Sequence, residues 1–161
     1  MKLRDVLFAS FIFFSSLIMG CSNEVDGIDK QAEAKETEFP PVMTGSIHVN
    51  DTEYEMVSGN FKWEKKEGSI TQVAQTDAAT PNQIAESFNA IELEKDMKIE
   101  IEVEDNPEIA VFLWNENSRE KEVTVNKNQI KTPTTDGQYI YEVLAKWSNG
   151  EVSYTFVIEV R

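Results

Sequence analysis

The sequence has 161 residues but only one cysteine and one histidine. The lone Cys21 excludes an intrachain disulfide and every metal site that needs several cysteines. With His48 alone, we do not expect a Ser-His-Asp triad or a histidine-rich zinc site. Basic residues are also scarce, since 15 Lys and Arg oppose 29 Asp and Glu for a net charge of −14. Because nucleic acid and anionic lipid are themselves negative, this charge argues against electrostatic binding to either.

The sequence also lacks an apolar run long enough to cross a membrane as a helix, which takes about 20 residues. Its N-terminal apolar run, residues 7–19, has 13 residues and follows the basic Lys2 and Arg4. A short apolar run behind a basic start is typical of a secretory signal peptide. This run leads directly into Ile18-Met19-Gly20-Cys21.

These four residues resemble the lipobox of bacterial lipoproteins, in which an aliphatic, a variable and a small residue precede a cysteine. The resemblance implies a diacylglyceryl group on the Cys21 sulfur and cleavage between Gly20 and Cys21 by signal peptidase II. Residues 1–20 would then be a cleaved signal peptide. Two acyl chains hold a protein stably at a bilayer, so we expect the mature chain on the outer face of a bacterial cell membrane, more in keeping with a Gram-positive organism. The alternative is an incidental cysteine within a cleaved or uncleaved anchor.

Residues 21–41 are polar and acidic after the cysteine, with few large apolar side chains. Such a segment buries too little apolar surface to fold, so we expect a disordered tether. From residue 42 onward, apolar and polar residues alternate with the period of two that indicates half-buried strands. We therefore expect one folded domain over residues 42–161, which is an ordinary domain length.

The expected strands are short and separated by turn residues, which predicts an all-β sandwich. They lie at residues 46–49, 54–57, 60–64, 97–103, 109–114, 139–147 and 152–160, with weaker candidates at 122–125 and 129–131. Asn149-Gly150 predicts a turn with positive φ between the last two strands. Thr80-Pro81-Asn82-Gln83 combines an N-cap Thr, an initial Pro and a Gln at the third helical position, which predicts one short helix over residues 81–88.

The segment Asp136-Gly137-Gln138-Tyr139-Ile140-Tyr141 resembles the tyrosine corner of immunoglobulin-like domains. The resemblance implies an Ig-like β-sandwich of about seven strands, in which the Tyr139 hydroxyl bonds to the backbone upstream. Tyr141 stands where an antibody domain has its second cysteine, and this departure fits bacterial Ig-like modules without the disulfide. Residues 137–160 also resemble the ends of small secreted proteins and lipoproteins of Bacillus-type bacteria. The fold itself implies no function, because it hosts many.

Acidic side chains are densest between residues 92 and 108, which raises the possibility of a site for Ca²⁺ or for a basic partner. Calcium needs six to eight converging oxygens, whereas Glu100, Glu102 and Glu104 alternate along one strand face. We therefore favour a solvated outer face that discourages edge pairing. Glu104 and Asp105, where the strand ends, are the best candidate metal ligands.

Aromatic residues provide a second group of candidates. Trp63, Trp114 and Trp147 lie in or at the end of apolar strands, so we expect them to pack in the core. Trp147 is the exception of interest, because it adjoins the turn at Asn149 and is the candidate for binding a glycan or peptide. His48 has no catalytic partner that the sequence identifies, and we expect it at an exposed or edge position.

Residues 68–80 form a long polar connection without a glycine-rich phosphate pattern. Connections of this length in a domain are often functional. We therefore expect a non-enzymatic, monomeric, lipid-anchored binding or accessory domain without a cofactor, whose partner is an envelope protein or wall component. One alternative is an inhibitor or modulator of a secreted protease or envelope sensor that uses residues 68–80. Another is a Ca²⁺-dependent or glycan-binding module.

Overall fold

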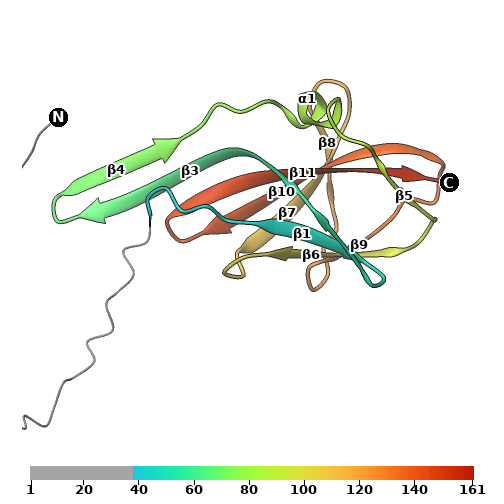
Figure 1. The fold of residues 1–161 in the computed structure, drawn as a ribbon, viewed down its shortest axis with the longest axis horizontal. Helices are drawn as coiled ribbons and strands as arrows, with labels where there is room; N and C mark the ends of the chain where they lie inside the picture. Colours follow the sequence, from blue (N-terminus) through green and yellow to red (C-terminus); the bar gives the residue numbers. More distant parts are fainter. Residues whose placement is uncertain (1–37) are drawn as a thin grey trace, which may run out of the picture. The chain divides into compact units, whose positions relative to one another are not determined.

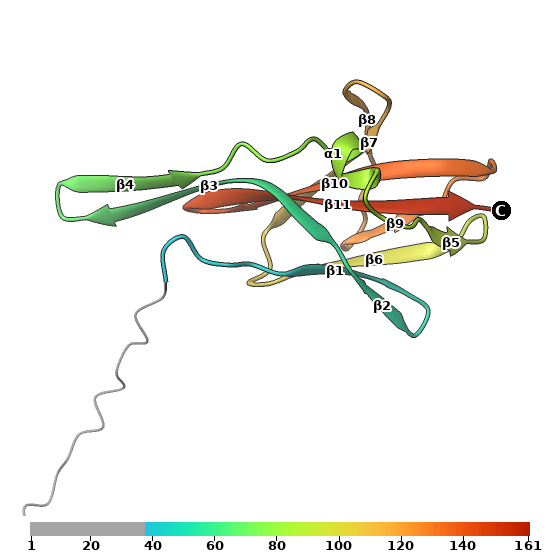
Figure 2. The same cartoon turned by 45° about the horizontal axis from the view of Figure 1, so that its top comes forward.

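In the computed structural model, which describes residues 38–161, two β-sheets pack face to face (Figure 1). Figure 2 shows the two layers from a second direction. Eleven strands and one short helix make up these residues. The expected all-β sandwich is thereby confirmed, although the number of strands exceeds the expected seven or so.

The small sheet has the strand order β2 (Thr52–Glu55), β1 (Gly45–Val49), β6 (Lys98–Val103) and β9 (Gln129–Lys131). The large sheet has the order β4 (Ile70–Gln75), β3 (Val57–Glu67), β11 (Gly150–Val160), β10 (Gly137–Trp147), β7 (Glu108–Trp114) and β8 (Arg119–Val123). A short strand, β5 (Ile91–Leu93), pairs in parallel with the end of β11, whereas all other pairs are antiparallel.

Four strands exceed the seven: β8 and β9 correspond to the two weaker candidates, whereas β4 and β5 were not expected. One boundary also differs. The expected strand at 54–57 is divided, because the chain crosses from the small to the large sheet at Met56, which is buried and whose amide donates to the carbonyl of Gly45 at 2.9 Å. The expected connection at 68–80 is wrong for residues 70–75, which form β4. Most of the β4 side chains are exposed on both faces, so the strand carries no apolar alternation that the sequence could display.

The core lies between the two sheets and is built from alternate residues of each strand. In β6, exposed and buried residues alternate strictly. One row of the large sheet joins Val111, Val143 and Tyr154, each at most 1% exposed. Burial of an aliphatic side chain of this size stabilises the fold by about 1.5–3 kcal/mol. The core therefore depends on the register of these strands, since a shift by one residue would turn every apolar side chain outward.

The helix α1 (Pro81–Ala85) rests on the outer face of the large sheet and begins as expected. The Thr80 hydroxyl accepts from the amide of Gln83, and the Gln83 side chain accepts from the amide of Thr80. The helix is three residues shorter than expected, because Ser87 and Phe88 bond to carbonyls three residues back and form a turn instead. Phe88 is left 48% exposed.

The expected hydrogen bond of the tyrosine corner is present. The Tyr139 hydroxyl donates to the carbonyl of Thr135 at 2.9 Å. The bond ties the start of β10 to the chain that precedes it. It joins residues only four apart, so it stabilises the entry to the strand rather than the packing of the two sheets.

The turn between β10 and β11 differs from the expectation, because neither Asn149 nor Gly150 has a positive φ. Gly150 is required instead by close packing. It lies opposite Trp63 in the β3–β11 pair, and a Cβ added to it would collide with the indole of Trp63. Trp63 cannot retreat easily, since it is 1% exposed and its ring centroid lies 5.0 Å from that of Trp147.

We therefore predict that Gly150→Ala lowers the free energy of unfolding by about 1–3 kcal/mol, the usual cost of overpacking. Urea denaturation followed by tryptophan fluorescence measures the change. The exposed neighbour in the same turn provides a control, since Ser148→Ala should leave the midpoint nearly unchanged. Equal midpoints for Gly150→Ala and the parent chain would contradict the packing role.

Candidate functional site

The β3–β4 hairpin projects from the sandwich, at the left of Figure 1. Trp63 is the last residue of β3 that pairs with β11. Beyond it, Glu64–Glu67 of β3 pair only with residues 70–73 of β4. We call residues 64–73 the arm. Its apolar side chains face water, with Ile70 66% and Val73 53% exposed.

Strand β4 is an edge strand of the large sheet and carries no charge. The sequence of β4, ITQVAQ, contains no charged residue and no proline. The other edge strands in the described residues are protected as natural edges usually are, by charge or by short length. Four of the five residues in β8 are charged, two of the four in β2 are glutamates, and β9 and β5 have three residues each. The six residues of β4 are therefore the longest unprotected edge.

The charges of the hairpin lie on β3, one strand in from the edge. Residues 57–75 contain three lysines and two glutamates, so this segment is weakly positive in a chain of net charge −14. Lys62 pairs with Glu64 at 3.1 Å, and Lys65 pairs with Glu67 at 2.9 Å. A protein that approaches β4 therefore meets neither a net negative charge nor a charged edge.

Three of the four weak candidates from the sequence lie together at the root of the arm. Trp147 is half-buried against Trp63, and its Nε1 donates to the carbonyl of Glu104 at 3.3 Å. The carbonyl of Asn149 accepts from the amide of Glu64 at 2.8 Å. These contacts fix the arm to the sandwich. The outer edge of β4 pairs with no other strand in residues 38–161.

Glu104 and Asp105, the candidate metal ligands, do not form a cluster. The Glu104 carboxylate accepts from the amide of Thr44 at 2.7 Å. Asp105 adopts a left-handed conformation in the turn, with φ 58°. Within residues 38–161, no three Asp, Glu, His or Cys side chains are arranged to hold a metal ion. Both residues shape the turn after β6.

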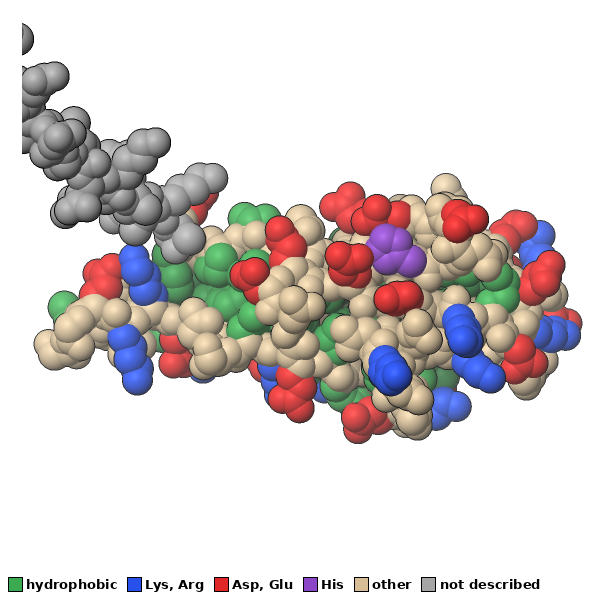
Figure 3. Space-filling view, turned by 90° about the horizontal axis from the view of Figure 1, so that it is seen from below, with side chains coloured by type: hydrophobic (Ala, Val, Ile, Leu, Met, Phe, Trp, Pro, Cys, Tyr) green, Lys and Arg blue, Asp and Glu red, His purple; other side chains and the backbone are tan. Residues whose placement is uncertain are grey.

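The outer face of the small sheet is acidic, as the alternation in β6 predicts. Figure 3 shows the single histidine among carboxylates on this face. Glu53 of β2 and Glu100 of β6 lie on either side of His48 in the strand register. The His48 Nε2 lies 3.1 Å from a Glu102 carboxylate oxygen. Carboxylates on β2 and β6 are separated by the width of β1, about 10 Å across two strand spacings, so the face is a solvated charged surface.

A buried carboxylate on the outer face of the large sheet was missed by the sequence analysis. Glu142 of β10 is 5% exposed and accepts two hydrogen bonds of 2.8 Å from Arg119 and one of 2.7 Å from the indole of Trp114. The hydrogen bond to Glu142 raises the pKa of Arg119, against the opposing effect of burial. The Arg119 guanidinium also lies 4.1 Å above the ring of Phe112. The expectation that Trp114 packs in the core is therefore wrong, because its indole is hydrogen-bonded to Glu142 on the outer face of the large sheet.

The sequence contains one indirect signal for this ion pair. Ile140 and Leu144 share a strand face with Glu142, so that face is partly apolar and a carboxylate on it is partly buried. Both oxygens of the Glu142 carboxylate accept hydrogen bonds, and the contacts attach β8 to the sheet. We assign the pair a structural role, because three hydrogen bonds already hold the carboxylate within the sheet.

Gly20 and Cys21, the expected cleavage and lipidation site, lie outside the described residues. Among the residues that the structure describes, no helix has the length and apolar character that a membrane crossing requires. No family model, no curated protein and no solved structure matches the chain.

Arg119→Ala should lower the free energy of unfolding by about 2 kcal/mol. The substitution leaves the buried Glu142 with one donor. The loss stays below the 3–5 kcal/mol of a fully buried pair because the Arg119 side chain is 42% exposed. Urea denaturation at neutral pH measures it. The double variant Arg119→Ala/Glu142→Leu should recover part of the loss, since no unpaired charge remains. A double variant less stable than Arg119→Ala would contradict this account.

Proposed function

We propose that the chain is a lipid-anchored, non-enzymatic binding domain on the outer face of a bacterial cell membrane, and that it holds an extended segment of a partner protein along β4. The lipobox-like residues that end in Cys21 support the anchor. The observation that carries the binding mode is the free, uncharged edge of β4. The partner class is an envelope protein with a strand-forming segment.

Strand addition suits this edge physically. An extended segment that pairs with a sheet edge gains main-chain hydrogen bonds, and its alternate side chains contact the two faces of the sheet. On β4, Thr71, Val73 and Gln75 share one face, while Ile70, Gln72 and Ala74 share the other. A partner strand with β-branched or uncharged side chains would cover Ile70 and Val73. Covering these exposed side chains adds a hydrophobic contribution to the main-chain bonds.

The position of the chain before β1 supports a partner close to the membrane. Thr44 is bonded to Glu104 at the root of the arm. Figures 1 and 2 both show the start of the described chain beside that root. The chain that would lead to the anchor therefore enters the domain on the side of the arm. The partner is therefore a membrane protein, or a secreted protein that acts at the membrane surface.

A photo-crosslinking amino acid at Gln72 of the full chain, expressed in the native envelope, should capture one defined protein. The same group at Lys121, on the charged edge strand β8, should not capture it. Adding Thr71→Lys and Val73→Lys should abolish the capture, because charges on an edge oppose pairing. Both residues are exposed, so stability should change by less than about 0.5 kcal/mol each.

The matched control for the lysine variants is Glu122→Lys on β8, which should leave the capture intact. Capture of the same protein from both edges, or capture that survives the two lysines on β4, would reject strand addition. If the captured protein is a protease or an envelope sensor, and its activity changes when the arm is altered, the domain acts as a modulator.

Cys21→Ser tests the anchor independently of the arm. The variant should either leave the membrane fraction or accumulate as an uncleaved precursor, because the acyl chains have no attachment atom. Cell fractionation and intact mass spectrometry distinguish the two forms. A processed chain that remains in the membrane fraction would show that the lipid anchor is absent.

A further inference from the structure

A pocket of about 360 Å³ opens where β11 changes neighbours. Strand β3 pairs with β11 as far as Thr155, and β5 pairs with it from Ile158 onward. The edge of β11 between these positions therefore has no strand beside it. β3 extends no further along β11 because it begins at Val57, and the chain before Met56 belongs to the small sheet. Volumes of about 300 Å³ and more are typical of small-molecule sites.

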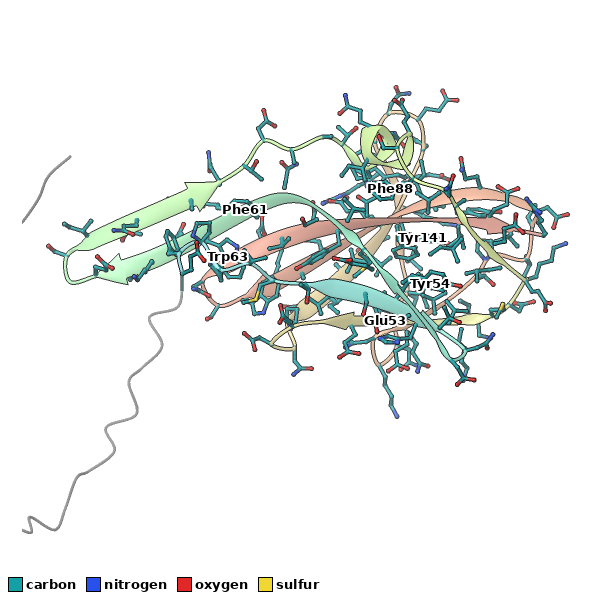
Figure 4. All side chains as sticks on the ribbon, in the orientation of Figure 1. Glu53, Tyr54, Phe61, Trp63, Phe88 and Tyr141 are labelled. Carbon is teal, nitrogen blue, oxygen red and sulfur yellow. The ribbon has the colours of Figure 1, made fainter. Side chains whose placement is uncertain are left out.

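Most of the wall of the pocket is apolar. Ile84, Phe88 and Ile91 line it from α1 and the segment that follows the helix, and Val57, Phe156 and Val157 line it from β3 and β11. Figure 4 shows Phe88 and Tyr54, another lining residue, with the side chains around them. In the described residues, Phe88 is the one exposed large apolar side chain outside the arm and the segment before β1. A ligand that covers its ring removes apolar surface from water.

Two polar features of the lining restrict the chemistry of a ligand. The hydroxyl of Thr155, a residue 2% exposed, is the only buried side-chain polar atom in the described residues without a hydrogen-bond partner. Buried polar groups are nearly always paired, so this wall offers an unused hydrogen bond. Glu53 and Glu55, which lie opposite His48 and Ser46 on the outer face of the small sheet, border the pocket as an exposed acidic rim, and the lining contains no Lys, Arg or His. The pocket therefore favours a positive group and repels a negative one.

We propose that this pocket binds a small cationic amphiphile, in which an aromatic or branched apolar group carries a primary amine. The apolar group lies against Phe88 and Ile91, and the ammonium group lies at the rim of the pocket, toward the carboxylates of Glu53 and Glu55. The site lies on β2, β11 and the segment 84–91. It is separate from β4, and the inference does not rest on strand addition.

The experiment uses the full chain in phosphatidylcholine nanodiscs with ¹³C-labelled isoleucine methyl groups. The probes are 2-phenylethylamine, 2-phenylethanol and phenylacetate, which share a ring and differ in charge. The amine should cause saturable shifts of the Ile84 and Ile91 methyl signals and leave Ile70 of the arm unchanged. The alcohol should bind more weakly than the amine, and phenylacetate weakest.

Variants of the acidic residues provide a matched pair. Glu55 and Glu102 lie on opposite sides of Ser46 in the register, but only Glu55 lines the pocket. Glu55→Gln should weaken binding of the amine by about two- to fivefold, the usual range for an exposed ion pair, and leave binding of the alcohol unchanged. Glu102→Gln should change neither. Phe88→Ala should weaken all three probes, and the partial exposure of Phe88 favours retention of the fold.

Three outcomes would overturn the proposal. The first is no saturable shift of Ile84 or Ile91 up to about 10 mM amine, a concentration at which even weak binding is detectable. The second is equal affinity for the three probes, which would show that charge has no part. The third is an equal effect of Glu55→Gln and Glu102→Gln, which would assign the preference to the general acidity of the chain.

Discussion

The pairing of β10 with β11 is the contact on which the rest of the domain depends. The two strands are paired along eleven residues each, from Gly137 opposite Val160 to Trp147 opposite Gly150. Every other strand of the large sheet joins this hairpin directly or through one neighbour, and α1 rests on the same two strands. Their inward side chains also supply much of the core. The hairpin therefore positions both the sheet and the surfaces that it presents.

The arm and the apolar pocket follow from one feature of this arrangement, the offset of β3 along β11. At one end β3 continues past the turn of the hairpin, so its last residues pair only with β4 and project as the arm. At the other end β3 leaves β11 at Thr155, before β5 begins, and the gap becomes the pocket. Gly150 sets this offset locally, because only a residue without a side chain accepts the indole of Trp63 at that position.

Charge is distributed unevenly over the domain. Carboxylates gather on the outer face of the small sheet, where they are solvated. The one carboxylate that is buried on the outer face of the large sheet is neutralised by Arg119. The edge of β4 carries none. Most of the described surface is therefore polar. At the arm and at the pocket, association with another molecule would remove apolar surface from water.

The sequence by itself determined the elements whose signals are local. The capping residues of α1, the alternation in β6 and the hairpin of the last two strands each follow from residues within one segment, as does the corner at Tyr139. Tertiary structure alone decided where those segments meet. β4 lacks an apolar face, so only its pairing with β3 identifies it as a strand. Glu142 is paired with a residue 23 positions away, and the pocket is formed by segments about 100 residues apart. Such contacts leave no periodic pattern in a single chain, because each depends on the register between strands that only the folded sheet establishes.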